Sequence, residues 1–306
     1  MTNLPAAAPA PLPGFVPRDR TLLMGVLNVT PDSFSDGGCW VDPEAAVAHA
    51  RELIAQGADI IDIGGESTRP GAQRVDADTE ISRVLPVVRA LLADGAGGAD
   101  GAGSADGAGA SGSAIVSVDT IHAATAEAAI DAGAHIINDV SGGLADPAMH
   151  GLIARTGVVY VCQHWRGDPE TMDRLTDYSA HGDVVAGVEA ELRERLAELD
   201  AAGVDRSQVV LDPGLGFAKT HAQSWELLAA PSRLIADLGR PLLVGSSRKR
   251  FLAQAAEAQA PPVQRDAVTA ATTALAAASG AWAVRVHEVP ANRAAVRTAS
   301  LWKEHQ

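Results

Sequence analysis

The chain has 306 residues, which is enough for one large domain or two ordinary ones. Its formal net charge of −14 excludes the broad basic surface with which proteins bind nucleic-acid backbones, so we expect no nucleic-acid partner. Two cysteines, Cys39 and Cys162, are too few for a disulfide framework, which favours a reducing compartment. Because 47% of the residues are apolar and only 4% are aromatic, the core is expected to be aliphatic.

The first 20 residues are rich in Pro and Ala and predict a flexible tail ahead of one domain over residues 21–306. They contain no basic run followed by an apolar stretch, so no signal peptide is evident. The best membrane candidate, residues 267–286, is interrupted by threonines and Arg285, which favours a buried helix. We therefore expect a cytoplasmic protein with no membrane partner.

Eight short aliphatic runs are predicted to be strands, and most are followed by an Ala-rich stretch of helical composition. The strands are expected at residues 22–29, 60–63, 115–118, 135–138, 158–162, 209–211, 241–244 and 284–286. The helices are expected at residues 43–56, 79–93, 123–132, 184–201 and 223–237. Such alternation fits a (β/α)8 barrel of roughly 250 residues or an open, doubly wound sheet. Eight units favour the barrel.

Residues 94–113 consist only of Gly, Ala, Asp and Ser, which predicts a flexible linker. The linker follows a helix, so we expect it on the far side of the barrel from the carboxyl ends of the strands. Those ends, in contrast, carry polar side chains after nearly every strand. Because the carboxyl ends ring one mouth of a barrel, the sequence predicts an active site there.

Seven of these strand-end segments stand out, at residues 25–38, 62–71, 117–120, 138–142, 212–217, 245–249 and 285–287. Taken together and in order, they closely resemble those of the dihydropteroate synthases, a pterin-binding family of the folate pathway. The resemblance implies a barrel enzyme, a transferase, which joins p-aminobenzoate to (7,8-dihydropterin-6-yl)methyl diphosphate and releases diphosphate. It also implies a homodimer, for which the sequence gives no independent sign.

The pterin ring presents adjacent N–H donors and a carbonyl acceptor, so its site needs a carboxylate and a cation. Within the resemblance we assign Asp212 to the N–H pair, Lys249 to the carbonyl, and Asp119 and Asn138 to the remaining edge. The alternative for Asp119 and Asp212 is that each caps a following helix.

The diphosphate leaving group needs cations and hydrogen-bond donors. Arg285 and His287 lie two apart on the last strand and should point the same way. Asn28 would offer its amide oxygen to Mg²⁺, which commonly bridges to substrate phosphates. Asp36 could accept the proton that the aniline nitrogen loses, although a turn role is an equal alternative. His287 could instead be a satisfied core histidine.

The p-aminobenzoate carboxylate would suit Ser247 at the start of a helix expected from residue 246. Its ring is expected among Phe34, Pro70, Phe217 and the stem of Lys249. Thr68 and Arg69 would close over both substrates. Arg248 belongs to the same expected helix start, and it could equally be a solvated charge on that helix.

Two other functions remain open from the sequence. One is a catalytically silent relative that only binds or regulates. The other is a methyltetrahydrofolate-dependent methyltransferase on the same barrel, although those relatives lack the loop over residues 28–35 and the Ser-Arg-Lys segment at 247–249.

Overall fold

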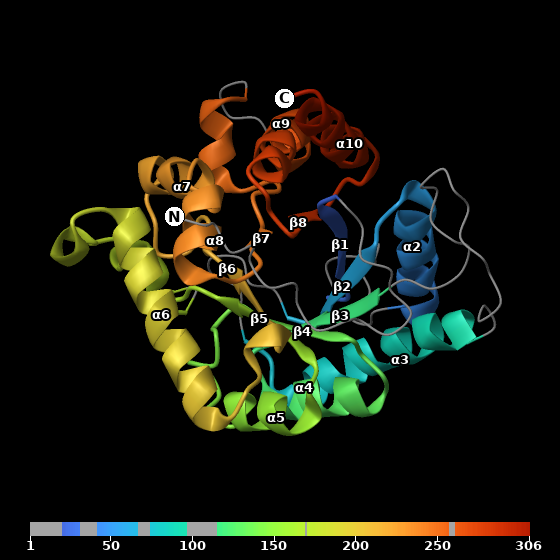
Figure 1. The fold of residues 1–306 in the computed structure, drawn as a ribbon. Coiled ribbons are helices and arrows are strands. Elements are labelled where there is room, and N and C mark those ends of the chain that lie inside the picture. Colours follow the sequence, from blue (N-terminus) through green and yellow to red (C-terminus); the bar gives the residue numbers. More distant parts are fainter. Residues whose placement is uncertain (1–19, 31–41, 67–73, 97–114, 169, 257–260) are drawn as a thin grey trace.

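Eight parallel strands form a nearly closed barrel with helices around it (Figure 1). The structure is a computed structural model, and it describes residues 20–30, 42–66, 74–96, 115–168, 170–256 and 261–306. The strands are β1 Leu22–Asn28, β2 Ile60–Gly64, β3 Ile115–Asp119, β4 Ile136–Asp139, β5 Val159–Gln163, β6 Val209–Asp212, β7 Leu243–Val244 and β8 Ala283–Val286. The prediction of a (β/α)8 barrel is confirmed.

The strands follow the order β6-β5-β4-β3-β2-β1-β8-β7, and every neighbouring pair is parallel. Closure between β6 and β7 depends on one isolated bridge, Leu211 to Leu242, together with a 2.9 Å bond from the Leu211 amide to the Pro241 carbonyl. The seam between these two strands is therefore the least paired part of the barrel.

Helices follow the strands and pack against their outer side. They are α2 Pro43–Gln56, α3 Ala77–Ala96, α4 Ala123–Asp131, α5 Met149–Thr156, α6 Val184–Ala202, α7 His221–Leu228, α8 Pro231–Leu238, α9 Asp266–Ala278 and α10 Pro290–Glu304. Short 3-10 helices lie at Met172–Arg174, Ser179–His181, Arg206–Gln208, Arg250–Gln254 and Pro262–Arg265. The start of α2 shows how sequence sets a boundary: the Asp42 carboxylate accepts from the Glu44 amide, and Pro43 occupies the first turn.

Successive side chains of a strand point to opposite faces, so the barrel has two apolar layers. Leu23 and Leu27 of β1 pack outward against the helices, within a large aliphatic core. Leu22 and Met24 point into the barrel and join Ile60, Ile115 and their counterparts on other strands. The inner layer fills the barrel below the carboxyl ends, so those ends form the floor of a mouth.

The predicted boundaries differ from the structure in several places, among them one helix, the linker and the tail. The helix expected at residues 223–237 is two helices, because Pro231 has no amide hydrogen to continue α7 and begins α8 instead. The linker expected from residue 94 starts later, since α3 continues to Ala96. At the end of the expected tail, Arg20 forms a 2.8 Å ion pair with Asp59. The rest of both segments lies outside the described residues.

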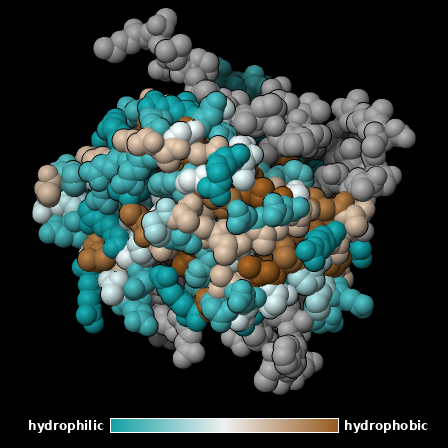
Figure 2. All heavy atoms as spheres, turned by 90° about the horizontal axis from the view of Figure 1, so that it is seen from below, coloured by the Kyte–Doolittle hydropathy of each residue, from teal (hydrophilic) through white to brown (hydrophobic). Residues whose placement is uncertain are grey.

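The side of the molecule that carries α4 and α5 shows patches of hydrophobic residues among hydrophilic ones (Figure 2). Within the described residues, no helix combines the length and the apolar character needed to cross a bilayer.

Candidate active site

Two glycines, Gly64 and Gly245, leave space at the mouth of the barrel. Polar side chains from several strands point into that space. A Cβ placed on Gly64, at the end of β2, would lie 3.8 Å from both Asn28 Oδ1 and Asp119 Oδ2. A Cβ on Gly245, just after β7, would lie 3.6 Å from Asp212 Oδ2 and 3.9 Å from Lys249 Nζ. The structure therefore brings these predicted residues together at one end of the barrel.

Asp62, Asp119 and Arg285 form an ion-pair network across the mouth. Arg285 Nε lies 2.6 Å from Asp62 Oδ2, and the guanidinium also donates to Asp119 Oδ2 at 2.7 Å. Asp62 further accepts from Asn138 Nδ2 at 3.0 Å and from the hydroxyl of Ser117 at 2.6 Å. The three side chains from β2, β3 and β8 are therefore fixed relative to one another before any substrate binds.

Burial changes the protonation of this network. Desolvation raises the pKa of Asp119 to about 7, although Arg285 opposes the shift. Burial alone would lower the pKa of Arg285. The negative charges of Asp62 and Asp119 outweigh burial and hold that pKa above the ordinary range. Arg285 is therefore a permanent cation, while Asp119 can gain a proton near neutral pH.

Asp212 and Lys249 lie on the two sides of the β6–β7 seam. Asp212 Oδ1 accepts from the Gly214 amide at 2.7 Å, and burial raises the pKa of the carboxyl, opposed mainly by Lys249. Lys249 Nζ donates to the Leu215 carbonyl and lies 4.7 Å from the centre of the Phe217 ring. Burial lowers the pKa of Lys249 to about 8, and Asp212 opposes that shift. The pair offers a carboxylate acceptor beside an ammonium donor.

Ser247 and His287 are joined directly. The Ser247 hydroxyl lies 2.9 Å from His287 Nδ1 and accepts from the His287 amide at 3.2 Å. The helix expected from residue 246 is wrong, because residues 247–248 form a turn and only a five-residue 3-10 helix follows, from Arg250. Arg248 adopts a φ of 59°, which ends any regular helix there, and it pairs with Asp266 at 2.7 Å.

A small pocket at the mouth is lined by Trp165, Met172 and Phe217 together with Glu66 and Arg74. Phe217 thus belongs both to this pocket and to the surroundings of Lys249. An apolar, aromatic wall beside fixed polar groups is the usual form of a small-molecule site.

The residues predicted on the first two loops, namely Phe34, Asp36, Thr68, Arg69 and Pro70, lie outside the described residues. Asn28 is described and half-buried at the end of β1. The part of the chain that the structure describes holds no cluster of three or more His, Cys, Asp or Glu suited to a metal ion. A single amide oxygen at the mouth nevertheless fits Mg²⁺ that is held mainly by substrate phosphates.

Asp62 was not among the site residues predicted from the sequence, although it lies within the segment 62–71. The available signal was a charged residue inside the otherwise apolar run of β2. In the structure Asp62 is fully buried. Asp139 is also fully buried, and it accepts from Tyr160, Ser141 and the Gly143 amide. Its partners fold the loop after β4, so we interpret it as structural.

The comparisons with known proteins agree with this geometry. The family model described as pterin binding enzyme matches residues 24–287. The chain is 48% identical over 286 residues to the dihydropteroate synthase of Mycobacterium leprae, covering 92% of this chain and 93% of that protein. It is 40% identical over 274 residues to the dihydropteroate synthase of Bacillus subtilis, covering 89% and 85%.

Solved structures show the same similarity. The dihydropteroate synthase of Xanthomonas albilineans with 4-aminobenzoic acid superposes with a TM-score of 0.79 at 40% identity, covering 94% of each chain. The structure of that enzyme with 7,8-dihydropteroate gives a TM-score of 0.74 at 35% identity, again covering 94% of each chain. The Yersinia pestis enzyme with a sulfonamide gives 0.83 at 35% identity, covering 96% and 99%. From its sequence, its barrel and the polar groups at the mouth, this chain belongs to the dihydropteroate synthases of the pterin-binding enzyme family.

Proposed function

We propose that this chain joins (7,8-dihydropterin-6-yl)methyl diphosphate to p-aminobenzoate, giving 7,8-dihydropteroate and diphosphate. The observation that carries the proposal is the position of Asp212 Oδ2 and Lys249 Nζ around Gly245, which gives an acceptor and a donor on one side of the mouth. The similarity to the synthases described above supports the same reaction.

In this proposal, Asp212 accepts from the amino group and ring N–H of the pterin, and Lys249 donates to its carbonyl. Asn138 donates one amide hydrogen to Asp62, and in this proposal its amide oxygen serves the remaining pterin edge, where Asp119 also contributes. Both aspartates are deeply buried, which excludes water and strengthens their hydrogen bonds to the ring.

The bond between the pterin methylene carbon and the diphosphate oxygen breaks, and a bond from that carbon to the aniline nitrogen forms. Arg285 and His287 stabilise the negative charge that develops on the departing diphosphate. Asn28 would hold Mg²⁺ through its amide oxygen. When bound, Mg²⁺ neutralises phosphate charge. Arg285 is already ion-paired with Asp62 and Asp119, so its orientation is set in advance.

For the second substrate, we propose that Ser247, Phe217 and the stem of Lys249 bind p-aminobenzoate, with the loop residues Phe34, Thr68, Arg69 and Pro70. Because the expected helix N-terminus is absent, the Ser247 hydroxyl and nearby amides would bind the carboxylate. The aniline nitrogen becomes acidic once it is bonded to carbon, and Asp36 could accept its proton.

The test is release of diphosphate by the purified full chain with both substrates and Mg²⁺, measured with and without p-aminobenzoate. Release that requires p-aminobenzoate supports the synthase reaction. A chain that binds pterin but releases nothing under any condition would be a silent relative. Binding of methyltetrahydrofolate together with a corrinoid protein would instead favour the methyltransferase.

We also propose that the chain forms a homodimer in a cytoplasmic setting. The threonines of α9 point inward, and its exposed face consists of Ala267, Ala271, Leu275 and Ala278. Next to it on α10, Leu301 and Trp302 are 57% and 64% exposed. Because large exposed apolar side chains commonly mark an interface, a second copy is the proposed partner here. The buried free thiol of Cys162 is consistent with a reducing compartment.

Sedimentation of Leu275→Asp tests the homodimer, with Leu144→Asp as the control on a different exposed leucine. We expect the first variant alone to shift toward monomer. A monomeric parent protein would refute the homodimer.

A further inference from the structure

Lys219 is a buried lysine to which the reaction described above gives no role. The chain has three lysines, and two of them, Lys219 and Lys249, are tied to the loop between β6 and α7, residues 213–220. The Lys219 residue is 6% exposed, and its Nζ lies 2.9 Å from His164 Nδ1 and 2.8 Å from the Phe217 carbonyl oxygen. A buried ammonium is stable only when such partners replace water.

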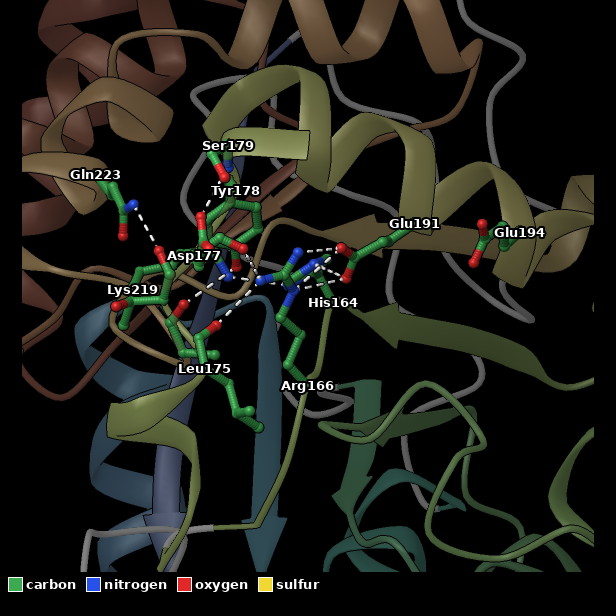
Figure 3. A network of polar contacts seen from close by, with 12 residues as sticks. His164, Arg166, Leu175, Asp177, Tyr178, Ser179, Glu191, Glu194, Lys219 and Gln223 are labelled. Atoms are coloured by element: carbon green, nitrogen blue, oxygen red, sulfur yellow. Dashed lines mark hydrogen bonds and ion pairs between the residues drawn. The ribbon is translucent and has the colours of Figure 1, made fainter. Parts of the chain in front are cut away.

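The hydrogen bonds around Lys219 fix the protonation state of His164. The Glu191 carboxylate only accepts, so Nε2 of His164 carries the hydrogen that is donated to it at 3.0 Å, and in the neutral ring Nδ1 accepts from the Lys219 amino group, whose pKa burial lowers. Burial and the nearby Lys219 charge lower the pKa of His164 to about 4, which agrees with a neutral ring. Figure 3 shows the resulting chain of contacts, in which His164 and Arg166 both reach Glu191 of α6. Lys219 is thereby anchored to a helix outside the barrel.

The loop that Lys219 holds has an unfavourable backbone shape. Ala218, directly before Lys219, has a φ of 51°, a conformation that non-glycine residues rarely adopt. Its carbonyl accepts from the hydroxyl of Tyr178 at 3.1 Å, while the preceding carbonyl accepts from Lys219. Earlier in the loop, Gly214 has a φ of 65°, and a Cβ there would lie 2.4 Å from the His164 carbonyl oxygen. Such a strained turn persists only where surrounding contacts hold it.

The held loop supplies two contacts to Lys249. The carbonyl of Leu215 accepts from Lys249 Nζ, and the ring of Phe217 lies 4.7 Å from it. We propose that Lys219 is a positioning residue, which holds the loop over residues 213–220 so that Phe217 lies against the ammonium of Lys249 and completes the p-aminobenzoate site. Lys219 itself contacts neither substrate. The inference rests on the proposed synthase function for the roles of Phe217 and Lys249.

The first test compares Lys219→Met, which keeps the length of the side chain and removes its donors, with the control Lys303→Met on the exposed end of α10. In steady-state kinetics we expect the KM for p-aminobenzoate to rise about tenfold in Lys219→Met, with kcat changed less than threefold. Lys219→Arg retains N–H donors and should recover part of the loss. An unchanged KM, or a fall in kcat at constant KM, would overturn the proposal.

The second test needs no substrate. With three lysines, ¹³C-labelled lysine gives three side-chain NMR signals, which Lys303→Arg and Lys219→Met assign. In Lys219→Met the pKa of Lys249 should rise from about 8 toward the ordinary lysine range, because burial is the main cause that lowers it and the loop would no longer shield Lys249 from water. An unchanged pKa of Lys249 in a folded variant refutes the positioning role even if the parent enzyme is active.

If Lys219→Met does not fold, Glu191→Gln takes its place. Glu191 lies at the partly exposed end of the network, and the amide keeps its shape while removing the charge that anchors His164 and Arg166. We expect changes in the same direction but smaller: the KM for p-aminobenzoate should rise about two- to threefold, and the pKa of Lys249 should rise. If neither changes, the proposal is overturned. If the parent protein releases no diphosphate but the variant still changes the pKa of Lys249, only the synthase function is refuted.

Discussion

Asp62 is the common acceptor of the ion-pair network at the mouth, and its replacement gives a sharp test. In Asp62→Asn, the new amide oxygen can still accept from Arg285 and Asn138, while the new amide nitrogen can donate to the Ser117 hydroxyl. All contacts are thus retained in shape, and only the negative charge is lost. The change therefore measures how much the carboxylate charge strengthens the buried hydrogen bonds with Asn138 and Ser117.

The expected magnitude follows from those two bonds. Hydrogen bonds to a charged group contribute about 1.5–3 kcal/mol and neutral ones about 0.5–1.5 kcal/mol. Two bonds become neutral ones, those with Asn138 and Ser117, which predicts a loss of about 2–3 kcal/mol in the free energy of unfolding, since the Arg285 guanidinium stays charged and keeps its bond to Asp119 at 2.7 Å. Asp62→Ala leaves all three donors, Arg285, Asn138 and Ser117, without this acceptor and should lose about 3–5 kcal/mol.

Urea unfolding of the two variants measures these losses, and the exposed Asp131→Asn serves as the control with nearly unchanged stability. Diphosphate release by Asp62→Asn should also fall, because a neutral amide holds the Arg285 guanidinium more weakly than the carboxylate does. A loss below about 1 kcal/mol for Asp62→Ala would refute the reasoning, since Arg285 would then have no need of this carboxylate.

Three further predictions concern Lys249, Glu191 and the Gly-rich segment. Lys249 is charged below its pKa of about 8, so pterin binding measured by calorimetry should weaken as the pH rises through 8. Lys249→Ala should weaken binding of both substrates, and an effect on one substrate alone would show that Lys249 does not contact both. Hydrogen bonds from His164 and Arg166 outweigh burial and lower the pKa of Glu191 to about 2, so its contribution to stability is present above pH 4.5 and is lost as the pH falls toward 2. Acid unfolding of Glu191→Gln should therefore depend less on pH between 4.5 and 2 than that of the parent, and equal dependence would contradict the assignment. Replacing residues 97–113 by a short Gly-Ser linker should leave kcat/KM nearly unchanged, whereas a large loss would mean that the segment reaches the mouth.

Much of the fold could be predicted because most barrel strands are short aliphatic runs with polar residues at or just after their carboxyl ends. The start of α2 was predictable at Asp42 and Pro43, where a local cap decides the boundary. The short β7 was less so: residues 241–244 are all apolar, but only two of them pair with β8. Pairing depends on the neighbouring strand, which a local pattern does not encode.

The site was predicted in part for the same reason. Asp119, Asn138 and Asp212 lie at the carboxyl ends of strands and Lys249 lies in the loop after β7, so their meeting at the mouth follows from the barrel. The partners of Arg285 could not be predicted, because Asp62 and Asp119 lie on different strands and are brought to it only by closure of the sheet. The turn at Arg248 was missed because its positive φ is stabilised by tertiary contacts such as the pair with Asp266.

The sparse pairing between β6 and β7 has a consequence for how the substrate and the fold depend on each other. Asp212 ends β6 and Lys249 follows β7, so a pterin that contacts both side chains spans the part of the barrel with the fewest backbone bonds. Bound pterin would then act as an extra cross-link there, and local opening of the seam would require its release. Amide hydrogens of Leu211 and Leu243 should exchange early in the free protein and slow markedly in the complex, more than amides between β1 and β2.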